Sequence, residues 1–130
     1  MNWKKKIIPF LFSLTVCAIA QGQTYKAYVK AANEAAAAKD YYSALIYNLN
    51  ALEFDSTKID RLHGAAEAAR NINSYKVAEQ YYQKVINLDK NDTYPLDKFY
   101  LAEMRQRQGN YTQAKGDYQM YLTGDRKSVV

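Results

Sequence analysis

The sequence of residues 75–86, YKVAEQYYQKVI, decides the fold of this chain because it recurs twice. It corresponds to YYSALIYNLNAL at residues 41–52 and to YTQAKGDYQMYL at residues 111–122. The tyrosine that opens each copy sets a spacing of 34 residues between the first two copies and of 36 between the second and third. A period of this size is typical of a stacked array of repeats, each of which is one supersecondary unit.

Small residues keep the same register within and before each copy. Every copy has an alanine at its fourth position, and another alanine lies twelve residues earlier. The pairs are Ala32 and Ala44, Ala66 and Ala78, and Ala102 and Ala114. Because the distance between two packed helices depends on the side chains at their contact, these alanines predict a close approach. The large apolar residues Leu52, Ile86 and Leu122 are expected to fill the space between successive pairs.

This order of a small residue, a tyrosine, an alanine and a large apolar residue resembles the tetratricopeptide repeat (TPR) family. The resemblance extends from Tyr25 to Leu122. It implies an all-α fold of three helix-turn-helix repeats, at about 25–58, 59–92 and 93–124, stacked into a short right-handed superhelix. The chain departs from the family pattern at Asn48, where an aromatic residue is common, and in a two-residue insertion around Thr93 and Tyr94.

The spacing of apolar residues and the turn residues between them predict helices throughout. In the second unit the apolar residues at three- and four-residue steps are Leu62, Ala65, Ala66, Ala69 and Ile72. Asp40, Ser74 and Asn110 precede the repeated tyrosines and are good N-cap types, Gly109 suits a left-handed helix end, and Pro95 suits a first helical turn. The expected helices cover about 25–38, 41–54, 58–72, 75–88, 94–108 and 111–122.

Eight of the thirteen tyrosines fall into two predicted groups. Those that occupy repeated positions are expected in the core: Tyr41, Tyr75, Tyr111, Tyr82 and Tyr118. Others are expected to be partly exposed, where an aromatic ring with a polar tip suits a binding surface: Tyr28, Tyr94 and Tyr100.

The first twenty residues have the layout of a secretory signal peptide. A basic segment at 1–6 precedes an apolar run at 7–20, which ends in the small-x-small pattern Ala18-Ile19-Ala20. An uncleaved anchor is the alternative, but the run is shorter than the ~20 residues that span a bilayer. We therefore expect export, to the periplasm or the outer membrane.

Cys17 offers a second interpretation of this leader. The sequence Leu14-Thr15-Val16-Cys17 resembles a bacterial lipoprotein box, although the residue before the cysteine is normally small. Lipidation at Cys17 would make the chain a lipid-anchored envelope lipoprotein with a structural role. Cleavage after Ala20 would instead remove this cysteine and leave a chain without a thiol or a disulfide.

Charge gives no indication of a nucleic-acid partner. The whole chain has a net charge of +5, and loss of the leader lysines Lys4, Lys5 and Lys6 lowers it to +2. A nearly neutral domain lacks the basic surface that binds phosphates.

No catalytic, cofactor or metal site is predicted. The chain has one histidine, His63, and no second metal-type residue at a useful spacing, whereas a metal site needs three or four ligands. One histidine and one leader cysteine cannot form a nucleophilic set, and the five scattered glycines form no phosphate loop. We expect His63 to be a solvated groove residue.

A protein or peptide partner is the remaining prediction. Repeat arrays bind along a concave face, which in the TPR family is lined mainly by the first helix of each pair. The family register carried onto this sequence gives Lys26, Val29 and Asn33 in the first unit, Asp60, His63, Glu67, Arg70 and Asn71 in the second, and Phe99, Glu103, Gln106 and Arg107 in the third.

The end of the chain shows no repeat pattern. Residues 125–130, DRKSVV, are also what a common short-read sequencing adapter gives when it is translated in frame. We expect this tail to be non-native or disordered and the chain to be part of a longer protein. A leader followed by three such repeats resembles the N-terminal region of Gram-negative envelope proteins that end in a peptidoglycan-binding OmpA-type domain. An accessory domain of an enzyme with its catalytic part elsewhere is a further alternative.

Overall fold

The computed structural model describes residues 24–127, with side chains through residue 124, and this part of the chain consists of helices without a strand. The first helix covers residues 24–37. It is followed by α2 (Tyr41–Leu52), α3 (Ile59–Asn71), α4 (Tyr75–Leu88), α5 (Asp97–Arg107) and α6 (Tyr111–Lys127). The all-α prediction is confirmed. The expected signal peptide and Cys17 lie outside the described residues.

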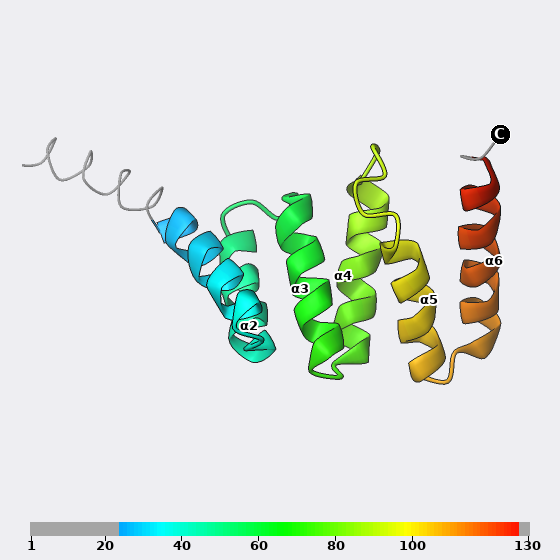
Figure 1. Ribbon diagram of the computed structural model, residues 1–130, viewed down its shortest axis with the longest axis horizontal. Helices are drawn as coiled ribbons and strands as arrows, with labels where there is room; N and C mark the ends of the chain where they lie inside the picture. The colour runs from blue at the N-terminus through cyan, green and yellow to red at the C-terminus, as the bar shows by residue number, and fades with distance from the viewer. Residues whose placement is uncertain (1–23, 128–130) are drawn as a thin grey trace, which may run out of the picture.

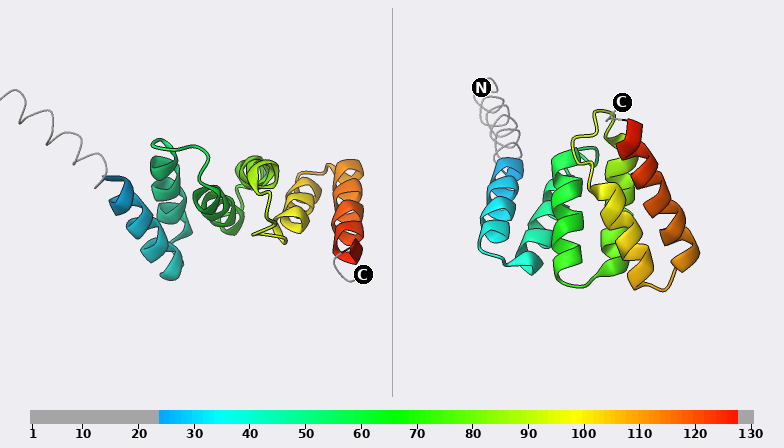
Figure 2. Two further views of the ribbon diagram at one scale, coloured as in Figure 1. Left: turned by 90° about the horizontal axis from the view of Figure 1, so that it is seen from above. Right: turned by 45° about the vertical axis from the view of Figure 1, so that its right-hand side comes forward.

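The helices stand side by side in one row (Figure 1). From α2 onward the extensive contacts join each helix to its neighbour in sequence: α2 to α3, α3 to α4, α4 to α5, and α5 to α6. Seen from above, consecutive helices alternate to either side of the row's long axis, and the helix of residues 24–37 and α6 lie at its two ends (Figure 2). Such an array is stabilised by contacts between neighbours rather than by one central core.

The alanines that define the repeat are among the most buried residues of the row. Those of the first helix of each pair, Ala32, Ala66 and Ala102, are at most 1% exposed, and those of the second helix, Ala44, Ala78 and Ala114, are at most 2% exposed. The equivalence predicted for these six positions is therefore present in the packing.

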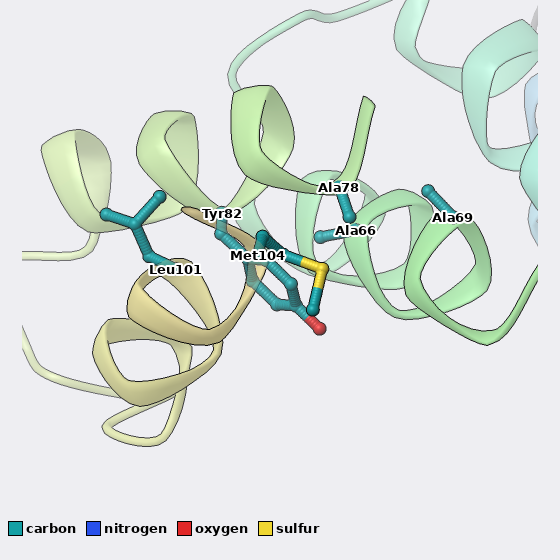
Figure 3. Packing of buried hydrophobic residues seen from close by; sticks show 6 residues of the cluster. All are labelled: Ala66, Ala69, Ala78, Tyr82, Leu101 and Met104. Carbon is teal, nitrogen blue, oxygen red and sulfur yellow. The ribbon is translucent and has the colours of Figure 1, made fainter. Parts of the chain in front are cut away.

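Two clusters of buried side chains join successive helices. One connects α2, α3 and α4 through Leu52, Leu62, Ala65 and Val85. The other connects α3, α4 and α5 around the ring of Tyr82, which Figure 3 shows gathered with the side chains of Ala66, Ala69, Ala78, Leu101 and Met104. Because α3 and α4 contribute to both clusters, they hold the row together at its centre.

The tyrosines that were predicted in the core differ widely in burial. Tyr82 is fully buried, Tyr75 and Tyr118 are half-buried, and Tyr111 is 68% exposed. Leu122, which was also expected to fill a seam, is 55% exposed. The core predictions for Tyr111 and Leu122 are wrong because no described helix packs on the far side of α6. The partial exposure predicted for Tyr28, Tyr94 and Tyr100 is confirmed.

The largest boundary errors fall on the last two helices. Helix α5 begins at Asp97, three residues later than expected, and Pro95 lies in the turn before it instead of in its first turn. Proline disfavours the helical conformation of the residue before it, so Tyr94 stays outside the helix. Helix α6 continues to Lys127, past its expected end at residue 122 and into the expected tail. Among residues 24–127 no helix is both long and apolar enough to cross a bilayer.

The turn within each helix pair has the same backbone hydrogen bonds in all three units. The residue two before the repeated tyrosine is left-handed: Lys39 (φ 60°), Asn73 (φ 62°) and Gly109 (φ 82°). In each turn the next residue's N–H donates to a carbonyl five residues back, over 2.9 Å in every case. This is the Schellman motif, in which a left-handed residue, usually glycine, ends the helix.

The three turns predict opposite effects of matched substitutions. Lys39→Gly relieves the left-handed strain of a residue with a Cβ and should stabilise the chain by about 0.5–1 kcal/mol. Gly109→Ala introduces the same strain and should destabilise it by about 1 kcal/mol. Urea unfolding followed by circular dichroism measures both changes, and equal effects of the two substitutions would show that the motif does not control helix ending.

Candidate functional site

The groove residues predicted in the first unit lie together in a surface pocket. This pocket, of about 410 Å³, is the N-terminal pocket; it is lined by Tyr25, Lys26, Val29, Lys30, Asn33 and Glu34. Asn33 faces the next pair, because its Oδ1 accepts a hydrogen bond of 3.0 Å from Nη1 of Arg61 on α3. The pocket combines an apolar side chain, Val29, with the ammonium group of Lys26.

The groove residues predicted in the third unit line a second pocket at the other end of the row. This C-terminal pocket, also of about 410 Å³, is lined by Phe99, Glu103, Gln106, Arg107, Tyr111 and Tyr118. Arg107 is exposed and donates to Glu103 over 3.3 Å, while the Tyr118 hydroxyl donates to Gln106 Oε1 over 3.0 Å. Tyr111 and Tyr118 were predicted only as core residues, and they are the members of this pocket that the sequence missed.

The second-unit residues are held by contacts within the chain. We call them, with their partners, the central network: Asp60, His63, Glu67 and Arg70 of α3, Tyr82 of α4, Tyr94, and Asp97 and Tyr100 of α5. Asn71 lies apart from it, exposed at the end of α3, where its side-chain amide donates to the Glu67 carbonyl over 2.8 Å.

One half of the central network surrounds His63. Its Nδ1 lies 3.0 Å from each oxygen of Asp97, a carboxylate that is 1% exposed. Its ring stacks on that of Tyr94, with centroids 3.9 Å apart and an interplanar angle of 11°. The Tyr94 hydroxyl in turn donates to Asp60 over 2.7 Å. His63 is half-buried, with 26% of its side chain exposed, and is not the solvated residue that was predicted, because Asp97 and Tyr94 from the next unit pack against it.

The other half of the network surrounds Glu67. One of its carboxylate oxygens accepts from the Tyr82 hydroxyl in a short hydrogen bond, and the other accepts from Arg70 Nη2 over 2.7 Å. Arg70 also donates from Nε to the Tyr82 hydroxyl over 3.0 Å, and its guanidinium lies 4.1 Å from the ring centre of Tyr100. Both carboxylate oxygens of Glu67 therefore have a side-chain partner within the network.

Burial perturbs the protonation of three network residues. It raises the pKa of Asp97, against the lowering effect of the hydrogen bond and charge of His63. It also raises the pKa of Tyr94 to about 12, and the hydrogen bond and charge of Asp60 act in the same direction. The pKa of Tyr82 is raised by burial and by Glu67. Both phenols therefore stay protonated near neutral pH and can act as hydrogen-bond donors.

His63, Glu67 and Asp97 form a group that the sequence analysis missed. Their potential ligand atoms all lie within 4.8 Å of one another. The repeat spacing did not indicate this pairing: Asp97 lies 34 residues after His63, as Tyr94 does after Asp60, whereas the second and third units are 36 residues apart. The two-residue insertion around Thr93 shifts Tyr94 and Asp97 out of the repeat register, so adding the period to a predicted groove residue would not have found them.

A buried amide replaces the expected aromatic residue at the seam between α2 and α3. Asn48 is 3% exposed; its Nδ2 donates to the Ala44 carbonyl over 2.9 Å, and its Oδ1 accepts from Arg61 Nη1 over 3.1 Å. Gly64 makes this possible, because a Cβ there would lie 2.9 Å from Asn48 Nδ2. Arg61 thereby connects the buried seam to Asn33 in the N-terminal pocket.

Comparison of the chain with protein-family models and with curated proteins finds no match in either case. The likeness to TPR proteins therefore stays a prediction that rests on the residues of this sequence.

The fit of Asn48 against Gly64 predicts an unusual response to alanine. Gly64→Ala should destabilise the chain by about 1–2 kcal/mol, although alanine is the better helix former, because the new methyl group displaces a buried, hydrogen-bonded amide. Gly116→Ala in α6 is the matched control, since a Cβ there meets nothing within 4 Å, and it should stabilise by up to about 1 kcal/mol.

Thermal and urea unfolding measure these differences. The double variant Gly64→Ala with Asn48→Ala should cost less than the sum of the two single changes, because the second substitution makes room for the first. Additive costs would refute the proposed steric coupling.

Proposed function

We propose that this chain is a TPR scaffold that binds a protein or peptide partner along the face formed by the helix of residues 24–37, α3 and α5. The repeated alanine register, the three equivalent turns and the single row of helices support three TPR units. In such units the proposed arrangement is a short right-handed superhelix, with these helices on its concave side. The proposed role is binding rather than catalysis.

The observation that carries the proposal is the placement of the predicted groove residues. All those of the first and third units line the N-terminal pocket and the C-terminal pocket, respectively. Each pocket offers an apolar anchor, Val29 or Phe99, and a cationic side chain, Lys26 or Arg107. Aromatic residues and arginine dominate the binding energy of many interfaces, so the C-terminal pocket is the stronger candidate for the main anchor.

The central network gives the face rigidity between the pockets. Its charged groups already accept or donate hydrogen bonds to one another, so a partner gains little by replacing those bonds. A binding segment that reaches both ends would cross α3 and leave this network intact. Binding to a preorganised face avoids the entropic cost of ordering it.

We further propose that the chain is exported and acts in the periplasm or at the outer membrane, as the N-terminal part of a larger envelope protein. In this arrangement the repeats would hold a protein partner while an OmpA-type domain binds the cell wall. The basis is the leader at residues 1–20 together with the likeness of a leader and three repeats to such proteins.

Site-specific photocrosslinking tests the binding face. Benzoylphenylalanine placed at Phe99 or at Lys26 should give the same covalent partner in the envelope fraction of the native host. At Tyr42, which is 67% exposed on α2, it should not. With the purified partner, Phe99→Ala and Arg107→Ala should each weaken binding by about tenfold or more. Equal crosslinking at Tyr42 would refute the assignment of this face.

Export and lipidation are tested separately. Cleavage after Ala20 predicts a mature protein that begins at Gln21, incorporates no labelled palmitate and is unaffected in location by Cys17→Ala. N-terminal mass spectrometry and metabolic labelling measure these outcomes. A palmitate label that disappears in Cys17→Ala would establish the lipoprotein alternative instead.

A further inference from the structure

We infer that His63, Glu67 and Asp97 form a binding site for a divalent transition-metal ion of the Zn²⁺ class, which would join α3 to the start of α5. The inference is independent of the proposed partner binding, because it concerns the central network and not the two pockets.

The fold brings the three ligands together from two units of the row. His63 and Glu67 lie one helical turn apart on α3 and therefore share a face of that helix. Asp97 opens α5 and turns its carboxylate toward His63, with both oxygens 3.0 Å from Nδ1. The three potential ligand atoms lie within 4.8 Å of one another. A small shift of the Glu67 side chain would bring all three within bonding distance of one ion.

The burial of Asp97 favours a cation at this point. Its carboxylate is 1% exposed, and the partner that the structure records for it is an imidazole. A buried anion is costly unless a compensating charge accompanies it. A divalent ion bound to Asp97 and His63 would supply that charge more fully than a proton shared between them.

The donor set selects the kind of ion. His63, Glu67 and Asp97 would supply three protein ligands, the number found in catalytic-type zinc sites, which leave a further position for water. Imidazole favours Zn²⁺, Fe²⁺, Co²⁺ or Ni²⁺ over Mg²⁺ and Ca²⁺, which prefer oxygen ligands alone.

Neighbouring side chains orient the ligands. The Tyr94 ring stacks on His63 and fixes its plane, and the Tyr82 hydroxyl donates to Glu67. Such outer contacts raise the affinity of many metal sites, because they hold each ligand in its binding orientation.

Metal binding by Glu67 would require the hydrogen bond from Arg70 to break. Its guanidinium donates to Glu67 over 2.7 Å and so competes with a metal for the same carboxylate. Its other contacts, to Tyr82 and to the ring of Tyr100, do not involve the metal ligands and can hold the side chain when Glu67 turns away. Removal of the Arg70 charge should therefore strengthen metal binding, an effect that a purely structural ion-pair network would not show.

Calorimetric titration of the full chain, without a polyhistidine tag and after treatment with chelator, tests the site with Zn²⁺, Co²⁺ and Mg²⁺. We expect one Zn²⁺ per chain, a higher unfolding temperature with Zn²⁺, a visible Co²⁺ absorption band and no effect of Mg²⁺. His63→Gln and Glu67→Gln should each lower the Zn²⁺ affinity at least tenfold. Glu67→Gln leaves the His63–Asp97 pair in place, so it remains informative if His63→Gln unfolds the chain.

Arg70→Gln provides the sharper comparison. It should raise the Zn²⁺ affinity about three- to tenfold, because it removes a competing positive charge next to the site, while the matched control Arg107→Gln should leave the affinity unchanged. The inference is overturned if the chain binds no Zn²⁺, if Glu67→Gln leaves the affinity unchanged, or if Arg70→Gln weakens binding.

Discussion

The burial of the repeated alanines is the constraint on which the rest of the structure depends. Ala66 and Ala78 are completely buried, and the equivalent alanines of the other two pairs are at most 2% exposed. A larger side chain at any of them would push the two helices of a pair apart, because buried packing tolerates little added volume. The repeat period has the same basis, because it places an alanine at the equivalent position of each helix in all three pairs.

The seams between pairs are filled in different ways. At the seam between α2 and α3, the short amide of Asn48 lies against Gly64, which has no side chain. At the corresponding place between α4 and α5, the ring of Tyr82 stacks with that of Tyr100, with centroids 5.8 Å apart. A small residue thus packs against a small side chain at one seam, and two large rings pack together at the other. Both seams are filled, although the residue types differ from one unit to the next within the chain.

The sequence was sufficient to predict the helices, the buried alanines and the turn at Gly109. Those features depend on local propensity and on a period that can be counted. It was not sufficient for the environment of His63, because the enclosing residues Tyr94 and Asp97 come from the next unit and their placement depends on how the pairs stack. The exposure of Tyr111 was missed for a related reason, since no described helix packs against its side of α6.

The central network arises where the repeat is interrupted. The insertion around Thr93 lengthens the connection to α5, and Asp89 stabilises that connection by accepting a 2.9 Å hydrogen bond from the Tyr94 N–H. This bond and Pro95 keep Tyr94 out of the helix, where its ring can lie on His63, and they make Asp97 the first helical residue beside it. The preceding connection, residues 53–58, is two residues shorter than the connection at residues 89–96. The insertion thus positions the polar side chains Tyr94 and Asp97 beside His63, while the repeated alanines position the helices.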